Sequence, residues 1–268
     1  MSLFTFILQA QNSEERYFKD KSHIPQGFGI HSDVGYSTYQ VEIDSSELHS
    51  AIDYDVIELT MGLSYVYGRW MWGLYSKLLL DELKSNIYLP QKSFDNQALI
   101  DKKESVLYLN YRIFEEENQS WRLNLLYRES RLNAKESLST FYAYRSHFNY
   151  QTKGVALSLV YGQKISEESS YFFNIGVLST QAKLEINEQI ENKPQDVYID
   201  DKSHAFGFKL TAGYNHQLSS QWILNLRADV WRLNFNRLDV ASLVGDQLPK
   251  ASLKEESFSS YLGLTWRF

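Results

Sequence analysis

The chain is poor in several residue types, and each shortage excludes a class of protein. It contains no cysteine, four prolines and thirteen glycines in 268 residues. The lack of cysteine excludes disulfides, zinc–thiolate sites and cysteine nucleophiles, so any chemistry must use oxygen or imidazole groups. The low proline and glycine content excludes a low-complexity chain. No segment approaches the roughly 18 to 20 consecutive apolar residues of a transmembrane helix.

Aromatic residues, by contrast, are abundant. They make up 15% of the chain, with 19 tyrosines and 6 tryptophans. The mean hydropathy is −0.40, a low value that is typical of a membrane β-barrel, because half of each strand and all of each loop are polar. The formal net charge is −6 and no basic stripe stands out, so nucleic acid is not an expected partner.

The segment 257–268 shows a strict alternation. Its even positions are apolar (Phe258, Leu262, Leu264, Trp266, Phe268) apart from Ser260, and its odd positions are mostly polar or small. One face of such a strand suits lipid and the other suits a polar lumen, and in a bilayer the sheet must close on itself. This segment resembles the C-terminal assembly signal of Gram-negative outer-membrane β-barrels. The resemblance implies export through the periplasm and a location in the outer membrane.

A period of about fifty residues supports the same interpretation. An aromatic residue follows a polar turn at Trp70, Trp121, Tyr171 and Trp222, and these positions are 51, 50 and 51 residues apart. A pair of membrane strands of roughly ten residues each, joined by one short turn and one long loop, fits that period. We therefore predict one domain, an all-β, closed, antiparallel, up-and-down barrel of about ten strands over residues 27–268.

The expected strands are 27–43, 54–67, 70–80, 105–113, 121–129, 153–163, 171–181, 204–215, 222–233 and 257–268. Short turns are expected at 68–69, 114–120, 164–170 and 216–221, and longer loops at 44–53, 82–104, 130–152, 182–203 and 234–256. Short turns face the periplasm in this class, so both termini are expected there. Residues 140–150 are expected to prolong the strands, with twelve strands as the alternative. In 27–43 the apolar positions change from even to odd numbers, which indicates a bulge or emergence from the membrane.

Residues 1–26 are expected to be a signal remnant and a periplasmic lead-in. The apolar segment 3–8, followed by Gln9 and Ala10, resembles the end of a secretory signal. Interfacial aromatic residues are expected to form a membrane girdle. Its predicted members are Tyr65, Tyr67, Trp70, Trp72, Tyr111, Trp121, Tyr161, Tyr171, Tyr214, Trp222, Trp266 and Phe268. The alternative is a soluble β-sandwich with a tyrosine-rich core.

The same alternation places nine charged side chains on the inner face. These predicted lumen residues are Glu58, Lys77, Arg112, Arg122, Arg128, Lys209, Arg227, Asp229 and Arg267. Ten strands enclose a cylinder of about 20 Å, which leaves a narrow or filled lumen. Two hypotheses remain open: a hydrated polar network that supports the wall, and a basic constriction that favours anionic solutes.

The sequence contains no metal-binding, cofactor-binding or established catalytic motif, so we prefer a non-enzymatic role and keep an enzymatic one as the alternative. One candidate constellation resembles surface proteases of the omptin family, which use an acidic pair and an Asp/His pair at the rim of a ten-stranded barrel. Its residues would be Asp53, Asp55, Asp201 and His204. The spacing departs from the omptin pattern, which has Asp-x-His. An Asp that orients a His could activate water there.

The predicted function is therefore a small-solute, anion-favouring channel or a structural barrel. The alternatives are an omptin-like surface hydrolase and an adhesion or assembly barrel that acts through its loops. Expected partners are outer-membrane lipid and lipopolysaccharide, the barrel-assembly machinery and a small anionic solute.

Overall fold

The computed structural model describes residues 26–44, 49–89, 92–94, 99–116, 118–138, 144–190, 193–238, 241–242 and 251–268. The predicted signal remnant and lead-in therefore lie almost entirely outside the described residues. Every regular element in the described part is a β-strand, so the fold is all-β as predicted. None of the described residues forms a helix long and apolar enough to cross a membrane.

Ten long strands form the wall. They are β1 (Gln26–Asp44), β2 (His49–Tyr67), β3 (Trp70–Leu89), β5 (Leu99–Glu115), β6 (Gln119–Leu138), β7 (Tyr144–Lys164), β8 (Ser169–Ile190), β9 (Lys193–Gln217), β10 (Trp222–Leu238) and β12 (Ala251–Arg267). Two short strands, β4 (Lys92–Phe94) and β11 (Ala241–Ser242), pair with β3 and β9.

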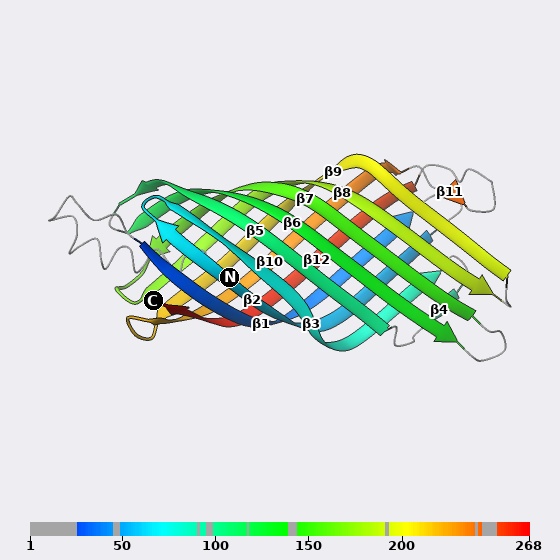
Figure 1. Cartoon of the computed structure of the whole chain (residues 1–268), viewed down its shortest axis with the longest axis horizontal. Coiled ribbons are helices and arrows are strands. Elements are labelled where there is room, and N and C mark those ends of the chain that lie inside the picture. The colour runs from blue at the N-terminus through cyan, green and yellow to red at the C-terminus, as the bar shows by residue number, and fades with distance from the viewer. Residues whose placement is uncertain are drawn as a thin grey trace.

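Each long strand pairs antiparallel with its neighbours, and the sheet closes on itself (Figure 1). The closing pair is β1 with β12, whose register runs without a shift from Gly29 opposite Arg267 to Asp44 opposite Ser252. Phe28 and Phe268 exchange two backbone hydrogen bonds of 3.1 and 3.2 Å at the end of this seam. Near the turn end this closure leaves no free sheet edge. Toward the loop end the β3–β5 pairing stops at Leu78 and Lys103, and the β9–β10 pairing stops at Phe206 and Asn234. The prediction of a closed ten-stranded antiparallel barrel is confirmed, and the twelve-strand alternative is not adopted.

The two ends of the barrel differ. At one end, which we call the turn end, short connections join β2 to β3, β5 to β6, β7 to β8 and β9 to β10. The tightest of them is a two-residue turn in which Gly68 has φ 59°, a left-handed conformation that glycine adopts without steric cost. At the opposite end, which we call the loop end, the strands continue well past their predicted limits.

The five predicted longer loops are wrong over most of their described residues, because strands run through them. Only the residues between the strands, such as 45–48 and 139–143, lie outside the described part. Residues 144–150 prolong β7, in agreement with the prediction for 140–150. We predicted loops where the outward-facing positions stop being apolar. The alternation of apolar and polar residues continues there, but the apolar residues now face inward and the polar residues face outward.

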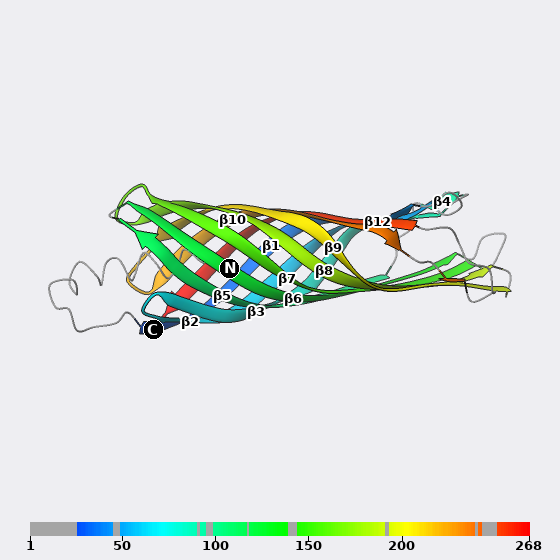
Figure 2. The same ribbon diagram turned by 90° about the horizontal axis from the view of Figure 1, so that it is seen from above.

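This continuation of the strands toward the loop end is called the extension. Figure 2 shows the two facing walls of the barrel approaching each other as they leave the turn end. On β6, Leu123, Leu125 and Tyr127 face outward and are exposed, whereas the next outward residues are Glu129 and Arg131. On β8, Lys183 donates to Glu185 at 2.9 Å and holds the pKa of that carboxyl below its usual value. The outer face of the extension is therefore polar.

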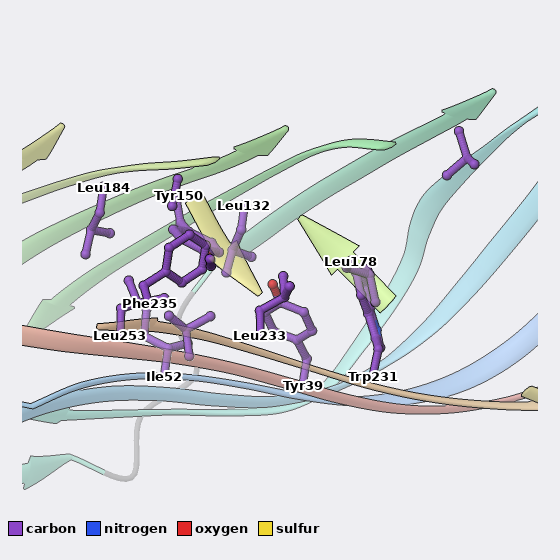
Figure 3. Close-up of a cluster of buried hydrophobic side chains, with 14 of the residues drawn as sticks. Tyr39, Ile52, Leu132, Tyr150, Leu178, Leu184, Trp231, Leu233, Phe235 and Leu253 are labelled. Carbon is purple, nitrogen blue, oxygen red and sulfur yellow. The ribbon is translucent and has the colours of Figure 1, made fainter. Parts of the chain in front are cut away.

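The inner face of the extension is an apolar core. Figure 3 shows side chains from the two facing walls pointing toward one another. The core includes Tyr39, Val41, Ile43, Ile52, Leu132, Phe148, Leu184, Leu233, Phe235 and Leu253, all at most 3% exposed. The strand β1 has no shift in register with either neighbour. The predicted bulge in 27–43 is thus wrong, and its apolar residues change parity because β1 enters this core.

Candidate functional site

The predicted lumen residues all lie on the inner face. Glu58, Arg122, Arg128, Asp229 and Arg267 are at most 6% exposed, and Lys77 is 8% exposed. The side chains of Arg112 and Arg227 are 10% and 8% exposed, and Lys209 lines a small internal cavity. The structure brings five of these nine together in two ionic groups, with partners that the sequence reasoning had not assigned to them.

The first group is the charge cluster, formed by Glu58, Glu104, Glu255, Lys77, Lys102 and Arg128 at the boundary between the extension and the rest of the barrel. Lys102 binds Glu58 at 3.0 Å, and Lys77 lies 3.5 Å from Glu104. Arg128 contacts Glu104 at 2.8 Å and Glu255 at 3.3 Å. Its charges balance, three against three, which is what burial of so many ions requires.

Hydroxyl groups complete the hydrogen bonding of the carboxylates. Ser37 and Tyr261 donate to Glu58 Oε2 at 2.7 and 2.9 Å. Tyr39 and Tyr150 donate to the two oxygens of Glu255 at 2.5 and 2.7 Å. Charge-assisted bonds of this kind are among the strongest in proteins. The cluster is consequently a layer of ion pairs and hydrogen bonds on the inner face that joins β1, β2, β3, β5, β6, β7 and β12.

Aromatic rings cover the cations of the same layer. The Arg128 guanidinium lies 3.3 Å from the ring centroid of Trp231, and the Lys102 ammonium lies 4.3 Å from that of Tyr39. Such cation–π contacts are most favourable where water is excluded. Trp231 and Tyr39 belong also to the apolar core, so the charge cluster packs directly against it.

The second group lies nearer the turn end. Arg227 bridges two carboxylates, at 3.2 Å from Asp229 and 3.6 Å from Asp33. A cavity of about 30 Å³ beside it is lined by Lys209, Thr211 and Asn174 among others. That volume suits one or two water molecules. The nearby His31 is 1% exposed, and neither of its ring nitrogens has a hydrogen-bond partner in the described part of the protein.

Sequence reasoning missed three members of the charge cluster: Lys102, Glu104 and Glu255. The predicted strands began at 105 and 257, so these residues were assigned to loops. They have the same parity as the inward residues that follow them on β5 and β12, which is the signal that could have identified them. Including them changes the inner-face count from seven basic and two acidic residues to eight basic and four acidic ones, so the basic excess falls only from five to four.

Of the four candidate catalytic residues, the structure describes the side chains of Asp53 and Asp55 alone. Asp53 and Asp55 are half-buried on the outer face of β2, since Ile52, Tyr54 and Val56 between and beside them are buried in the apolar core. Asp201 and His204 belong to β9, but their side chains lie outside the described residues. The strands β2 and β9 are separated by β1, β12 and β10.

The predicted girdle residues lie on the outer face near the turn end. The rings of Trp70 and Tyr111 are 4.6 Å apart, and those of Trp121 and Tyr161 are 4.9 Å apart. Beyond this collar the outer wall is apolar, with Leu, Val, Ile and Phe side chains 37% to 72% exposed. An apolar depression of about 610 Å³ lies on this outer wall.

Comparison with known proteins identifies the fold. No protein-family model and no curated protein matches the chain. Among solved structures it is similar to the outer membrane protease OmpT from Escherichia coli, with a TM-score of 0.70, 10% sequence identity, and coverage of 93% of this chain and 99% of that chain. It also matches the translocator domain of the autotransporter NalP from Neisseria meningitidis, with a TM-score of 0.48 and 11% identity over 100% of both chains.

At these identities the likeness concerns the fold alone. The chain has the closed ten-stranded antiparallel β-barrel fold of Gram-negative outer-membrane proteins. Barrels of this fold serve unrelated functions, so the function has to be argued from the lumen and the surface of this chain.

Proposed function

We propose that the chain is an integral outer-membrane β-barrel that is closed to solutes and acts at the cell surface through its extension. An exposed apolar wall with an aromatic collar at one end is what a membrane-spanning barrel presents to lipid. The polar outer face of the extension suits water. The turn end then faces the periplasm and the loop end projects from the cell.

The observation that carries this proposal is the filled lumen. A solute that moved from the turn end to the loop end would first meet the second group, around Arg227. It would then meet the charge cluster and, after that, the apolar core. The inward cavity beside Asp229 measures about 30 Å³ and the one beside Arg122 about 20 Å³. Neither accommodates more than one or two water molecules.

The charge balance argues in the same direction. The charge cluster, the second group and Lys209, which lines the cavity beside that group, together contain five carboxylates and five cations. The carboxylates are Glu58, Glu104, Glu255, Asp33 and Asp229, and the cations are Lys77, Lys102, Arg128, Lys209 and Arg227. A constriction that selects anions needs a surplus of positive charge. In this part of the lumen the cations are instead matched within the wall, which favours a structural role over an anion-selective channel.

Conductance measurements test the closed lumen. The purified barrel in a planar bilayer is expected to show no discrete steps at any applied voltage. A double variant, Glu104→Ala with Arg128→Ala, removes two large side chains from the charge cluster and is expected to show small steps if it folds. Discrete, anion-dependent steps from the unmodified protein would reject this proposal and support the predicted channel.

Cysteine labelling tests the orientation, and the chain offers a background free of cysteine. Lys135 is exposed on the extension and Glu168 is exposed in a short turn. We expect a membrane-impermeant maleimide to label Lys135→Cys on intact cells and to label Glu168→Cys only after the outer membrane is opened. The reverse pattern would exclude a surface role for the extension.

Lipid, lipopolysaccharide and the barrel-assembly machinery follow as proposed partners of such a barrel. The omptin-like hydrolase is not favoured, because Asp53 and Asp55 lie on the outer face. Its simplest test is a peptide-cleavage assay on intact cells with His204→Ala as the comparison. Cleavage that depends on His204 would replace the proposed role.

A further inference from the structure

Positive charge gathers on one outer wall of the extension. On β5, β6 and β7 the described outward side chains of the extension include four lysine or arginine residues and two carboxylates. The basic residues, which we call the cationic patch, are Lys103, Arg131, Lys135 and Lys153, and the carboxylates are Asp101 and Glu129. The side chains of Lys103, Arg131 and Lys153 are more than half exposed, so a partner outside the barrel reaches them.

The opposite wall of the extension has the reverse charge. On β1, β2, β10 and β12 the described outward side chains include five carboxylates and two lysine or arginine residues. The carboxylates are Glu42, Asp44, Asp53, Asp55 and Glu256, and the basic residues are Arg232 and Lys254. A negatively charged partner is therefore attracted to the first wall and repelled by the second.

The cationic patch begins where the apolar outer wall ends. Leu107, Tyr127 and Val155 form one row across β5, β6 and β7, and all three line the apolar depression of about 610 Å³. The next outward row toward the loop end is Ser105, Glu129 and Lys153, and Lys103 and Arg131 lie in the row beyond it. An apolar depression thus leads directly to a group of cations, an arrangement that matches a lipid with an anionic headgroup.

The charges within the patch repel one another. Lys103 and Arg131 stand directly opposite in the register of β5 and β6, and like charges in this position destabilise a strand pair. Glu129 contacts both Arg131 and Lys153, at 3.2 and 3.3 Å, so one carboxylate serves two cations. Lys103 lies 3.7 Å from Asp101. An anion bound among Lys103, Arg131 and Lys153 relieves this repulsion, which favours its binding.

We propose that the cationic patch and the apolar depression together bind lipopolysaccharide through its lipid A part, which has phosphate groups and several acyl chains. This inference rests on the orientation given under the proposed function, in which the loop end projects from the cell. The row of Leu107, Tyr127 and Val155 then lies at the boundary of the outer leaflet. The phosphates contact the patch, where Arg131 offers a bidentate guanidinium and the lysines offer point charges. The acyl chains lie in the depression.

Titration of the refolded, detergent-solubilised barrel with diphosphoryl lipid A tests this site, with native mass spectrometry as the readout. Each cation that is lost from the patch should weaken the apparent affinity about fivefold. We therefore compare the unmodified protein with Arg131→Gln and with the double variant Arg131→Gln, Lys153→Gln. These side chains are exposed, so the variants should fold.

Two further variants separate a defined site from general attraction. Glu129→Gln removes the carboxylate that Arg131 and Lys153 share, and it should strengthen the binding of lipid A. Arg232→Gln removes an exposed arginine from the opposite wall and should leave binding unchanged. Equal affinities in all the variants would overturn the proposal.

Two other ligands test the choice of lipid A. Inorganic phosphate at matched ionic strength lacks acyl chains and should not displace lipid A. Displacement would show that the depression is not part of the site. Phosphatidylglycerol, with a single phosphate, should bind more weakly than lipid A. Equally tight binding that depends on the same cations would show a general site for anionic lipids and would overturn the assignment to lipopolysaccharide.

Failure of this inference is distinguishable from failure of the proposed function. If cysteine labelling places the extension outside the cell but binding of lipid A does not depend on the patch, only the lipid site is wrong. If the labelling pattern is reversed, the patch does not face the outer leaflet, and the proposed function and the lipopolysaccharide site are both rejected.

Discussion

The extension and the rest of the barrel use the same strands in opposite ways. On β10, Leu226 faces outward and is 46% exposed, while Leu233, seven residues further on, faces inward and is fully buried. On β6, Arg128 is inside and Leu125 outside, whereas Leu132 is inside and Arg131 outside. The backbone pairing continues through the change with the same inward and outward alternation. Only the polarity of the two faces is exchanged.

The difference teaches that the backbone alternation does not by itself decide which face is apolar, because the same alternation carries both arrangements. Where the outer wall is apolar, charged residues face inward and form ion pairs with one another. Where the outer face is polar, the interior can collapse into a dry core. The charge cluster lies where the two arrangements meet. Its buried ions pack against an apolar layer, so they need ion-pair and hydrogen-bond partners within the cluster itself. Four substitutions test this comparison, in order of decreasing cost to stability.

The largest effect is expected from Arg128→Met. The change leaves Glu104 and Glu255 without their shared cation in a buried layer, and breaking such a pair typically costs about 3 to 5 kcal/mol. Urea unfolding of the detergent-solubilised protein should show this loss as a lower midpoint. Stability equal to that of the unmodified protein would mean that water reaches the charge cluster and that the lumen is not sealed.

Leu233→Ala tests the apolar core of the extension. Truncation of a fully buried leucine costs about 2 to 5 kcal/mol, and the loss should fall mainly on the extension. Hydrogen exchange is expected to lose protection in β10 above Trp231 while the strands near the turn end stay protected. The matched control is Leu226→Ala on the same strand, which removes a side chain from the outer wall and leaves no internal cavity.

Leu157→Arg tests the outer wall. Leu157 is 47% exposed and has apolar neighbours on both sides along β7. An arginine near the middle of a bilayer costs a barrel about 2 to 4 kcal/mol. Refolding into phospholipid vesicles, followed by electrophoretic band shift, measures it. The reverse change on the extension, Arg232→Leu, should cost far less, and equal costs would contradict the assignment of the wall to lipid.

The smallest effect is expected from Glu129→Gln. Glu129 contacts Arg131 at 3.2 Å and Lys153 at 3.3 Å on the outer face, where both cations are more than half exposed. Exposed pairs contribute about 0 to 1 kcal/mol and are screened by salt. Unfolding at low salt and at about 1 M salt should show a small loss that vanishes in high salt. A loss as large as that of Arg128→Met would remove the distinction between the two regions.

Much of the fold followed from local patterns. The fifty-residue period predicted the hairpins correctly, because each short turn marks the end of one strand and the start of the next. The aromatic residues that define this period are Trp70, Trp121, Tyr171 and Trp222. The strand lengths were underestimated, because the predicted pattern required apolar residues outside. Residues such as Leu132 and Phe148 do alternate with polar neighbours, but they have the parity of lumen residues.

The partners within the lumen could not be predicted in the same way. Glu58 on β2 meets Lys102 on β5, and Arg128 on β6 meets Glu255 on β12, across strands that are not neighbours in the sheet. Their contact depends on how far the wall curves and on the stagger of every intervening register. No spacing along the chain encodes those distances.

By itself the sequence determined that this protein is an all-β chain of antiparallel hairpins with two faces of unlike polarity, because a strand places successive side chains on opposite sides whatever surrounds it. Only the tertiary structure decided which side chains meet on the inner face of the barrel. Closure brings Arg128 on β6 within contact of Glu255 on β12, and brings the two walls of the extension together over an apolar core. Both are contacts between distant strands, and they exist only once the last strand pairs with the first.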